Sequence, residues 1–214
     1  MNAVAARMDK RGGRFAPGGA DLLVLSALIA LAALPLLAGR TPAALIYRPD
    51  AVLAGQWWRV FTHPLAHVSI YHLVLDAGAF LLLYRQLAPL GLARRVAIAA
   101  AAAAGSLAAA HLAPGAFASG LCGLSGAAHG LMAALGLDMA LRGAARERRA
   151  GWTSLAMVVG KSLIEAATGS VFFADIHLGD IGRPIAVCHL GGVFGGAVAW
   201  AVAGGRARKT PSES

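Results

Sequence analysis

The chain has 214 residues, of which 58% are hydrophobic and only 14% are charged, and its formal net charge is +9. This composition is too apolar for an ordinary soluble domain of that length, so we expect a membrane protein. The positive charge does not indicate nucleic-acid binding, because that function needs a basic face on a folded soluble domain. Here the basic residues form short clusters between apolar runs, which is typical of membrane proteins.

Six apolar stretches approach the roughly 20 residues that a helix needs to cross a bilayer. In chain order they cover residues 22–39, 64–84, 96–112, 121–141, 152–173 and 185–205. The first follows a basic segment, but it is long for a signal peptide and no small-residue cleavage site follows, so we expect a retained span. We therefore predict an all-α membrane domain of six transmembrane helices over residues 21–205, between basic tails at 1–20 and 206–214.

The distribution of Lys and Arg predicts the orientation. Fourteen of these 19 residues fall on one side of the predicted spans, in the two tails and in the segments 85–95 and 142–149. Because basic loops stay in the cytoplasm, both termini are expected there. The opposite side holds only Arg40, Arg48, Arg59 and Arg183.

Polar side chains within a membrane are costly to bury, so those in the predicted spans are candidates for function. They are His63, His67, His72 and Asp76 at the second span, Ser125 and His129 in the fourth, Lys161 and Glu165 in the fifth, and His189 in the sixth.

Ser125 and His189 are the strongest pair among these candidates. Each lies four residues into its predicted span from the same face, which places both about 6 Å inside the membrane surface. Ser125 also lies at a helix start, where free backbone N–H groups favour a negative charge. The alternative is that Ser125 is only a helix cap or a small packing residue.

A catalytic contact between these residues would need their helices to approach closely. Gly126 and Gly130 are four residues apart on the fourth span, as are Gly192 and Gly196 on the sixth, and small residues at this spacing let membrane helices touch. The same glycines could equally pack a bundle that has no catalytic site beside them.

His72 and Asp76 are also four residues apart and share a helix face, so a histidine N–H could donate to an oxyanion there. The histidines of the second span could equally be metal ligands or interfacial residues. The HExxH pattern of an intramembrane metalloprotease is absent from the sequence, and we expect no metal and no cofactor.

These residues resemble the rhomboid family of intramembrane serine proteases over nearly the whole chain, from residue 22 to residue 205. The matching motifs are Trp58-Arg59 in the first loop, His67 with His72 at the start of the second span, Gly123-Leu124-Ser125-Gly126 at the fourth, and His189 followed by Gly192 and Gly196 in the sixth.

The resemblance implies that Ser125 is the nucleophile and His189 the general base. His72 and the Ser125 backbone N–H would form the oxyanion hole. Asp76 stands where the family often has an asparagine donor, and an ionised carboxylate cannot donate. No acid within the sixth span would orient His189, so we predict a dyad.

His129, Lys161 and Glu165 resemble the rhombosortase subfamily, in which His129 replaces a tyrosine that often packs on the catalytic histidine. This resemblance implies a substrate that is an exported protein with a C-terminal, Gly-Gly-containing membrane tail. It also implies the bacterial inner membrane, with the site toward the periplasm. The alternatives are a general rhomboid protease of single-span proteins, a non-catalytic rhomboid-like protein that binds membrane clients, and a histidine-lined metal or proton transporter.

Two further pairs follow from position. Cys122 and Cys188 are close in sequence to the predicted catalytic residues near the outer face. They could form a disulfide with each other, or they could be two ordinary buried thiols. Lys161 and Glu165, four residues apart, are expected to pair with each other or with a polar bundle interior, since an unpaired charge in lipid is costly.

Overall fold

The structure, a computed structural model, describes residues 19–113, 116–118, 120–172 and 178–204. Almost all of the predicted tails, at 1–18 and 206–214, lies outside these residues. The regular secondary structure of the described part is helical, and the only strand-like pairing there is an isolated bridge between Tyr47 and Leu121. The predicted all-α fold is confirmed for this part of the chain.

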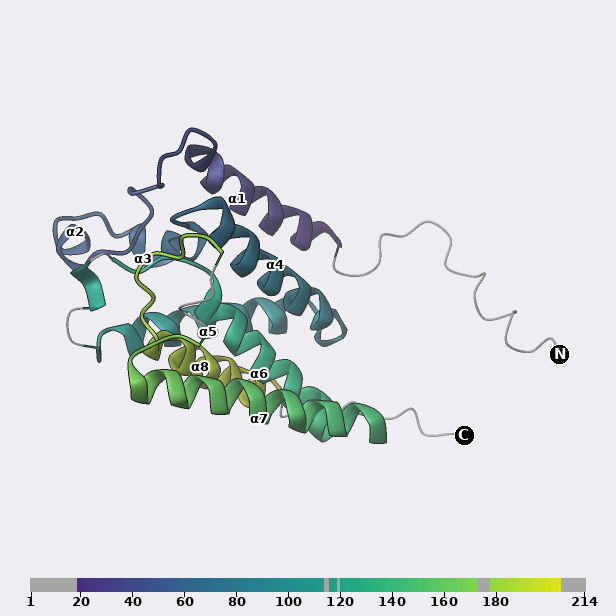
Figure 1. The fold of residues 1–214 in the computed structure, drawn as a ribbon. Coiled ribbons are helices and arrows are strands. Elements are labelled where there is room, and N and C mark those ends of the chain that lie inside the picture. Colours follow the sequence, from purple (N-terminus) through teal and green to yellow (C-terminus); the bar gives the residue numbers. More distant parts are fainter. Residues whose placement is uncertain (1–18, 114–115, 119, 173–177, 205–214) are drawn as a thin grey trace.

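Six long helices lie alongside one another and alternate in direction (Figure 1). Each overlaps one of the six apolar stretches that the sequence predicts. They are α1 (Gly19–Leu37), α4 (Ile70–Gln86), α5 (Leu92–Ala110), α6 (Ser125–Arg142), α7 (Ala145–Thr168) and α8 (Val187–Gly204). Short helices precede α4, namely α2 (Pro49–Leu53), α3 (Arg59–Thr62) and η2 (His63–Leu65), and two further single turns are η3 (Ala88–Leu90) and η4 (Ala116–Ala118).

By length and composition alone, α1 and α5 could each cross a membrane. The second predicted span, 64–84, is broken: α3 and η2 meet α4 at a bend of 97°, and together they would make a third crossing. The bend falls in the short segment between η2 and α4, and Pro64 lies in η2 itself. The helix α8 is apolar but shorter. The six-span arrangement therefore remains a prediction.

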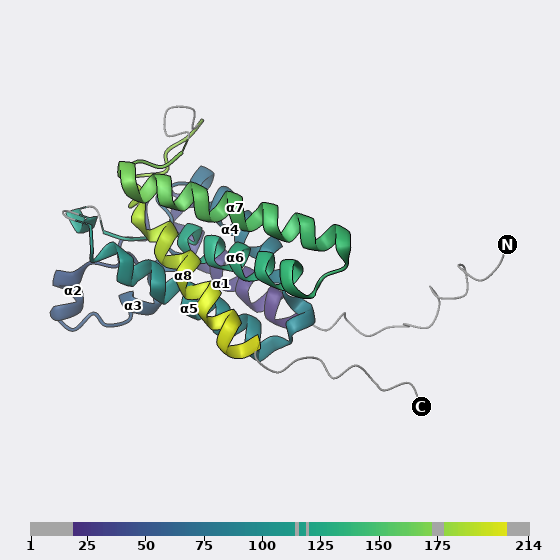
Figure 2. The same cartoon turned by 90° about the horizontal axis from the view of Figure 1, so that it is seen from below.

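The helices α5, α6 and α8 pack most closely, through glycines on two faces of α8. A Cβ atom on Gly192 would meet the Gly126 backbone, and one on Gly196 would meet the Gly130 backbone. The predicted glycine contact between these two helices is thus confirmed. The helix α7 packs against α6 and lies in front of it in Figure 2, while α1 packs against α4 on the side of the bundle away from α7 (Figure 1).

The segment between α1 and α4 is fixed by the Trp58-Arg59 motif. The Arg59 guanidinium donates to the carbonyls of Ala43 and Ile46, at 2.6 Å each, and the Trp58 indole donates to the Ala44 carbonyl at 3.0 Å. The same segment pairs Tyr47 with Leu121 through two backbone hydrogen bonds. This loop therefore holds the chain that leads into α6.

Tyr47 itself is buried against aromatic rings. Its hydroxyl is 3.0 Å from His111 Nε2, and Phe117 lies edge-on to its ring. Burial raises the pKa of Tyr47, so its phenol stays neutral.

Candidate active site

The first turns of α4, α6 and α8 all lie at one end of the bundle and bring three predicted site residues together. Ser125 is the first residue of α6, while His72 and His189 are each the third residue of their helices. The predicted depth of four residues therefore needs correction, because α6 and α8 begin later than the predicted spans. The prediction that Ser125 and His189 occupy the same end of the bundle is confirmed.

Gly123 shapes the approach to Ser125. Its φ angle is +99°, a region that side chains other than glycine rarely adopt, and its N–H donates to the His63 carbonyl. A Cβ atom here would lie 2.6 Å from Asp76 Oδ2 and 3.0 Å from His72 Nε2. The glycine therefore lets the chain pass directly over these two side chains.

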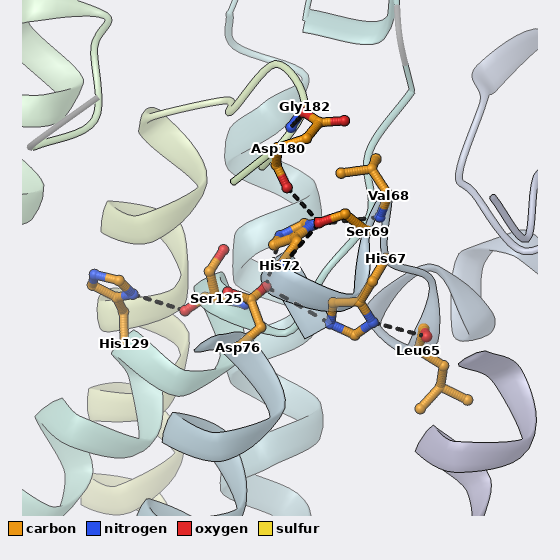
Figure 3. Close-up of polar contacts among 10 residues, drawn as sticks. All are labelled: Leu65, His67, Val68, Ser69, His72, Asp76, Ser125, His129, Asp180 and Gly182. Carbon is orange, nitrogen blue, oxygen red and sulfur yellow. Dashed lines mark hydrogen bonds and ion pairs between the residues drawn. The ribbon is translucent and has the colours of Figure 1, made fainter. Parts of the chain in front are cut away.

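Asp76 lies between the two groups that are predicted to hold an oxyanion. Its Oδ2 atom accepts a hydrogen bond from the Ser125 backbone N–H at 3.0 Å and lies 3.0 Å from His72 Nε2 (Figure 3). His67 Nε2 is farther from the same oxygen, at 3.9 Å. The Asp76 carboxylate is an acceptor in this arrangement and does not take the place of the asparagine donor that the family often has at this position.

His189 is fixed by residues of α6 and α7. Its Nδ1 atom is 2.6 Å from Glu165 Oε2, and its ring stacks on the His129 ring with centroids 4.0 Å apart and planes 7° from parallel. His129 Nδ1 in turn lies 2.7 Å from the carbonyl oxygen of Ser125. A dashed line marks this contact in Figure 3. His129 therefore connects the Ser125 backbone to the His189 ring.

The predicted ion pair between Lys161 and Glu165 is confirmed, with Nζ and Oε1 2.7 Å apart. Lys161 Nζ is also 2.9 Å from His129 Nε2. The contact between Glu165 and His189 was not predicted, because it joins two different helices. The signal available in the sequence was a pair of opposite charges, Lys161 and Glu165, in an otherwise apolar stretch.

Ser125 and His189 line one cavity of about 630 Å³, which is the size of a typical ligand pocket. Polar groups at its wall include His72, Asp76 and Lys161. The segment from Asp180 to Ile185 lines another side, and the Ser69 hydroxyl donates to the Asp180 carbonyl. This hydrogen bond joins the segment before α8 to the N-cap residue of α4, and both elements border the cavity.

The disulfide considered between Cys122 and Cys188 is not formed in the structure, where both residues are free thiols. Cys188 is buried among apolar neighbours in the first turn of α8, and Cys122 lies half-buried in the loop before α6. Both also line the cavity.

The rhomboid-domain family model matches residues 54–206, which include every residue of the site described above. No curated protein and no solved structure matches the chain at a significant level.

Proposed function

Because the chain belongs to the rhomboid family of intramembrane serine proteases, we propose that Ser125 is its nucleophile and His189 its general base. The observation that carries this assignment is the shared cavity: both side chains line it, and His129 connects the Ser125 backbone to the His189 ring. In unliganded enzymes the hydrogen bond between nucleophile and base is often long and shortens when substrate binds.

In the proposed reaction, Ser125 Oγ attacks the carbonyl carbon of the scissile peptide while His189 Nε2 takes the hydroxyl proton. The tetrahedral intermediate collapses as His189 delivers that proton to the leaving amine nitrogen. The resulting acyl-enzyme reacts with water or another nucleophile, from which His189 removes a proton. His189 returns that proton to Ser125 Oγ as the bond between Oγ and the acyl carbon breaks and the product leaves.

The oxyanion would be held by the Ser125 N–H and His72 Nε2–H. Both groups already point at one oxygen atom, Asp76 Oδ2, at 3.0 Å each. A carboxylate oxygen in that position is a stand-in for the charged oxygen of the tetrahedral intermediate, and its distances are those that such a site requires. Substrate would have to displace the Asp76 carboxylate to use the same donors.

For the substrate, we propose a membrane-anchored exported protein whose C-terminal tail carries glycines near the bilayer surface. The support is the resemblance of His129, Lys161 and Glu165 to rhombosortases, together with the location of the cavity at the helix ends. A helical span hides its carbonyls in hydrogen bonds, and glycine makes it easier to unwind. The site would face the periplasm in the bacterial inner membrane.

A cleavage assay in bilayers tests this proposal. The purified protein is incubated with a substrate whose C-terminal span follows a glycine-rich junction, and with the same substrate in which leucines replace those glycines. We expect cleavage of the first alone, and none by Ser125→Ala. Equal cleavage of both substrates, or cleavage only of N-terminally anchored ones, would leave a general rhomboid protease. Cleavage by Ser125→Ala would remove the assignment of the nucleophile.

A metal or proton transporter is the alternative with a specific observation behind it. Ligand atoms of His129, Glu165 and His189 lie within 4.8 Å of one another, a spacing that could hold a metal ion. However, the Lys161 ammonium already contacts His129 Nε2 and Glu165 Oε1, so a positive charge occupies that position. The arrangement therefore favours proton chemistry at His189 over metal binding.

A further inference from the structure

Glu165 is the most completely enclosed charged group of the site. Its side chain has no exposed surface, yet both carboxylate oxygens have partners. Oε2 lies 2.6 Å from His189 Nδ1, while Oε1 lies 2.7 Å from Lys161 Nζ and accepts from the Phe172 N–H at 2.8 Å. A buried carboxylate persists only with such compensation, so Glu165 is held ionised and in one orientation.

These contacts decide which nitrogen of His189 carries the proton. An ionised carboxylate can only accept hydrogen bonds, so Nδ1 of His189 must be the protonated nitrogen. The free lone pair then lies on Nε2, the nitrogen that the proposed reaction needs as a base. When Nε2 takes a proton, the positive imidazolium has a carboxylate at hydrogen-bonding distance.

His129 fixes the plane of the same ring. The Lys161 ammonium has only donors, so His129 Nε2 accepts from it and His129 Nδ1–H donates to the Ser125 carbonyl. The His129 ring is therefore neutral, anchored at both nitrogens and stacked parallel to His189. Groups from α6 and α7 thus restrict both the rotation and the tautomer of a residue on α8.

We propose that Glu165 is the positioning residue of His189, so that the site is a Ser125–His189–Glu165 triad spread over α6, α8 and α7. This inference rests on the proposed function. In the acylation step the Ser125 proton moves to His189 Nε2 as the Oγ–C bond forms, and then moves to the leaving nitrogen. Glu165 stays ionised throughout and receives no proton, which is the role of the acid in a serine-protease triad.

The test compares Glu165→Gln with Glu165→Asp, using kcat and KM for the glycine-junction substrate in bilayers. A glutamine amide can donate to Nδ1 and stabilise the wrong tautomer, so we expect kcat to fall by about 10³–10⁴-fold with little change in KM. Aspartate keeps a carboxylate, which can only accept hydrogen bonds. The kcat of Glu165→Asp should therefore lie between that of Glu165→Gln and that of the wild type. Asp138→Asn is the matched control, because it removes a partly buried carboxylate that bonds Trp200 and Arg142 away from the cavity.

A second measurement does not depend on a folded variant. Nitrogen-15 NMR of histidine-labelled wild-type protein, at a pH where the His189 ring is neutral, should show the proton on Nδ1. A proton on Nε2 would overturn the inference. So would a Glu165→Gln variant with wild-type kcat, while an inactive Ser125→Ala leaves the proposed function intact. If Ser125→Ala still cleaves, the proposed function itself fails.

Discussion

The carboxylate of Asp76 conflicts with the proposed reaction, because it uses the donors that the oxyanion would need. Its carboxylate accepts from the Ser125 N–H and lies at hydrogen-bonding distance from His72, the two donors that an oxyanion would use. Two negative oxygens cannot share these donors without repulsion. In its observed position Asp76 therefore occupies the proposed oxyanion hole and would compete with the transition state for its donors.

Replacing Asp76 with asparagine should relieve this competition. The amide keeps the size of the side chain, removes the negative charge and adds a donor, so we expect kcat for the glycine-junction substrate to rise by roughly tenfold, or about 1.4 kcal/mol in barrier. The measurement is kcat for the folded variant in bilayers beside wild type. A folded Asp76→Asn variant with lower kcat would show that the carboxylate supports His72 during the reaction.

At this scale the sequence shows which residues are unusual but not how they face one another. His72 and Asp76, and likewise Lys161 and Glu165, were paired correctly because residues four apart share a helix face. The contact between Glu165 and His189 depends on how α7 and α8 are rotated about their axes. Spacing within one helix carries no information on that rotation, so this contact required the structure.

Among the elements, α8 determines how closely the proposed catalytic groups can approach. Gly192 and Gly196 face the backbone of α6, while Gly191 and Gly195 face α5. A methyl group added at Gly192 or Gly196 would meet backbone atoms of α6. Backbone atoms cannot move aside as a flexible side chain can, so even alanine would not fit without a shift of the helices.

Gly196→Ala should therefore lower the free energy of unfolding of the detergent-solubilised protein by about 1–3 kcal/mol, as overpacking typically does. The measurement is a decrease in its melting temperature. Gly160→Ala is the matched control, because Gly160 lies inside α7 and a Cβ atom there meets nothing within 4 Å. It should be neutral or stabilising, since alanine favours helix over glycine by about 1 kcal/mol. Equal melting temperatures for Gly196→Ala and wild type would show that α6 and α8 are not in backbone contact.

The helix boundaries illustrate what apolar length can predict. The six stretches were found because each is long and apolar, but α7 begins at Ala145 rather than at residue 152, and α4 begins at Ile70 rather than at residue 64. The first turns of α7 are polar, so hydropathy did not include them. The start of α4 is instead marked by Ser69, whose side chain caps the helix by accepting from the His72 N–H.

For the whole molecule, the alternation of helix directions and the distribution of basic residues make the same prediction about orientation. The α6–α7 connection lies at the opposite end of the bundle from Ser125 (Figure 1), and it belongs to the basic side. By the positive-inside rule that end should face the cytoplasm.

Single cysteines measure this orientation directly, after Cys122 and Cys188 are replaced by alanine. In intact cells a membrane-impermeant maleimide should modify Ala54→Cys, at the exposed end of α2, and should spare Ala144→Cys until the membrane is opened. Both positions are exposed, so each variant serves as the labelling control for the other. Modification of Ala144→Cys alone in intact cells would invert the predicted topology.

The assignment of Ser125 and His189 as a serine-protease pair is tested most directly by an activity-based label. The purified wild-type protein is treated with a fluorophosphonate probe, which reacts only with activated serines, and the modified residue is identified by mass spectrometry. We predict one adduct, on Ser125, and no labelling of folded Ser125→Ala or His189→Ala. Labelling of folded His189→Ala at the wild-type rate, or an adduct on another serine, would contradict the proposed mechanism.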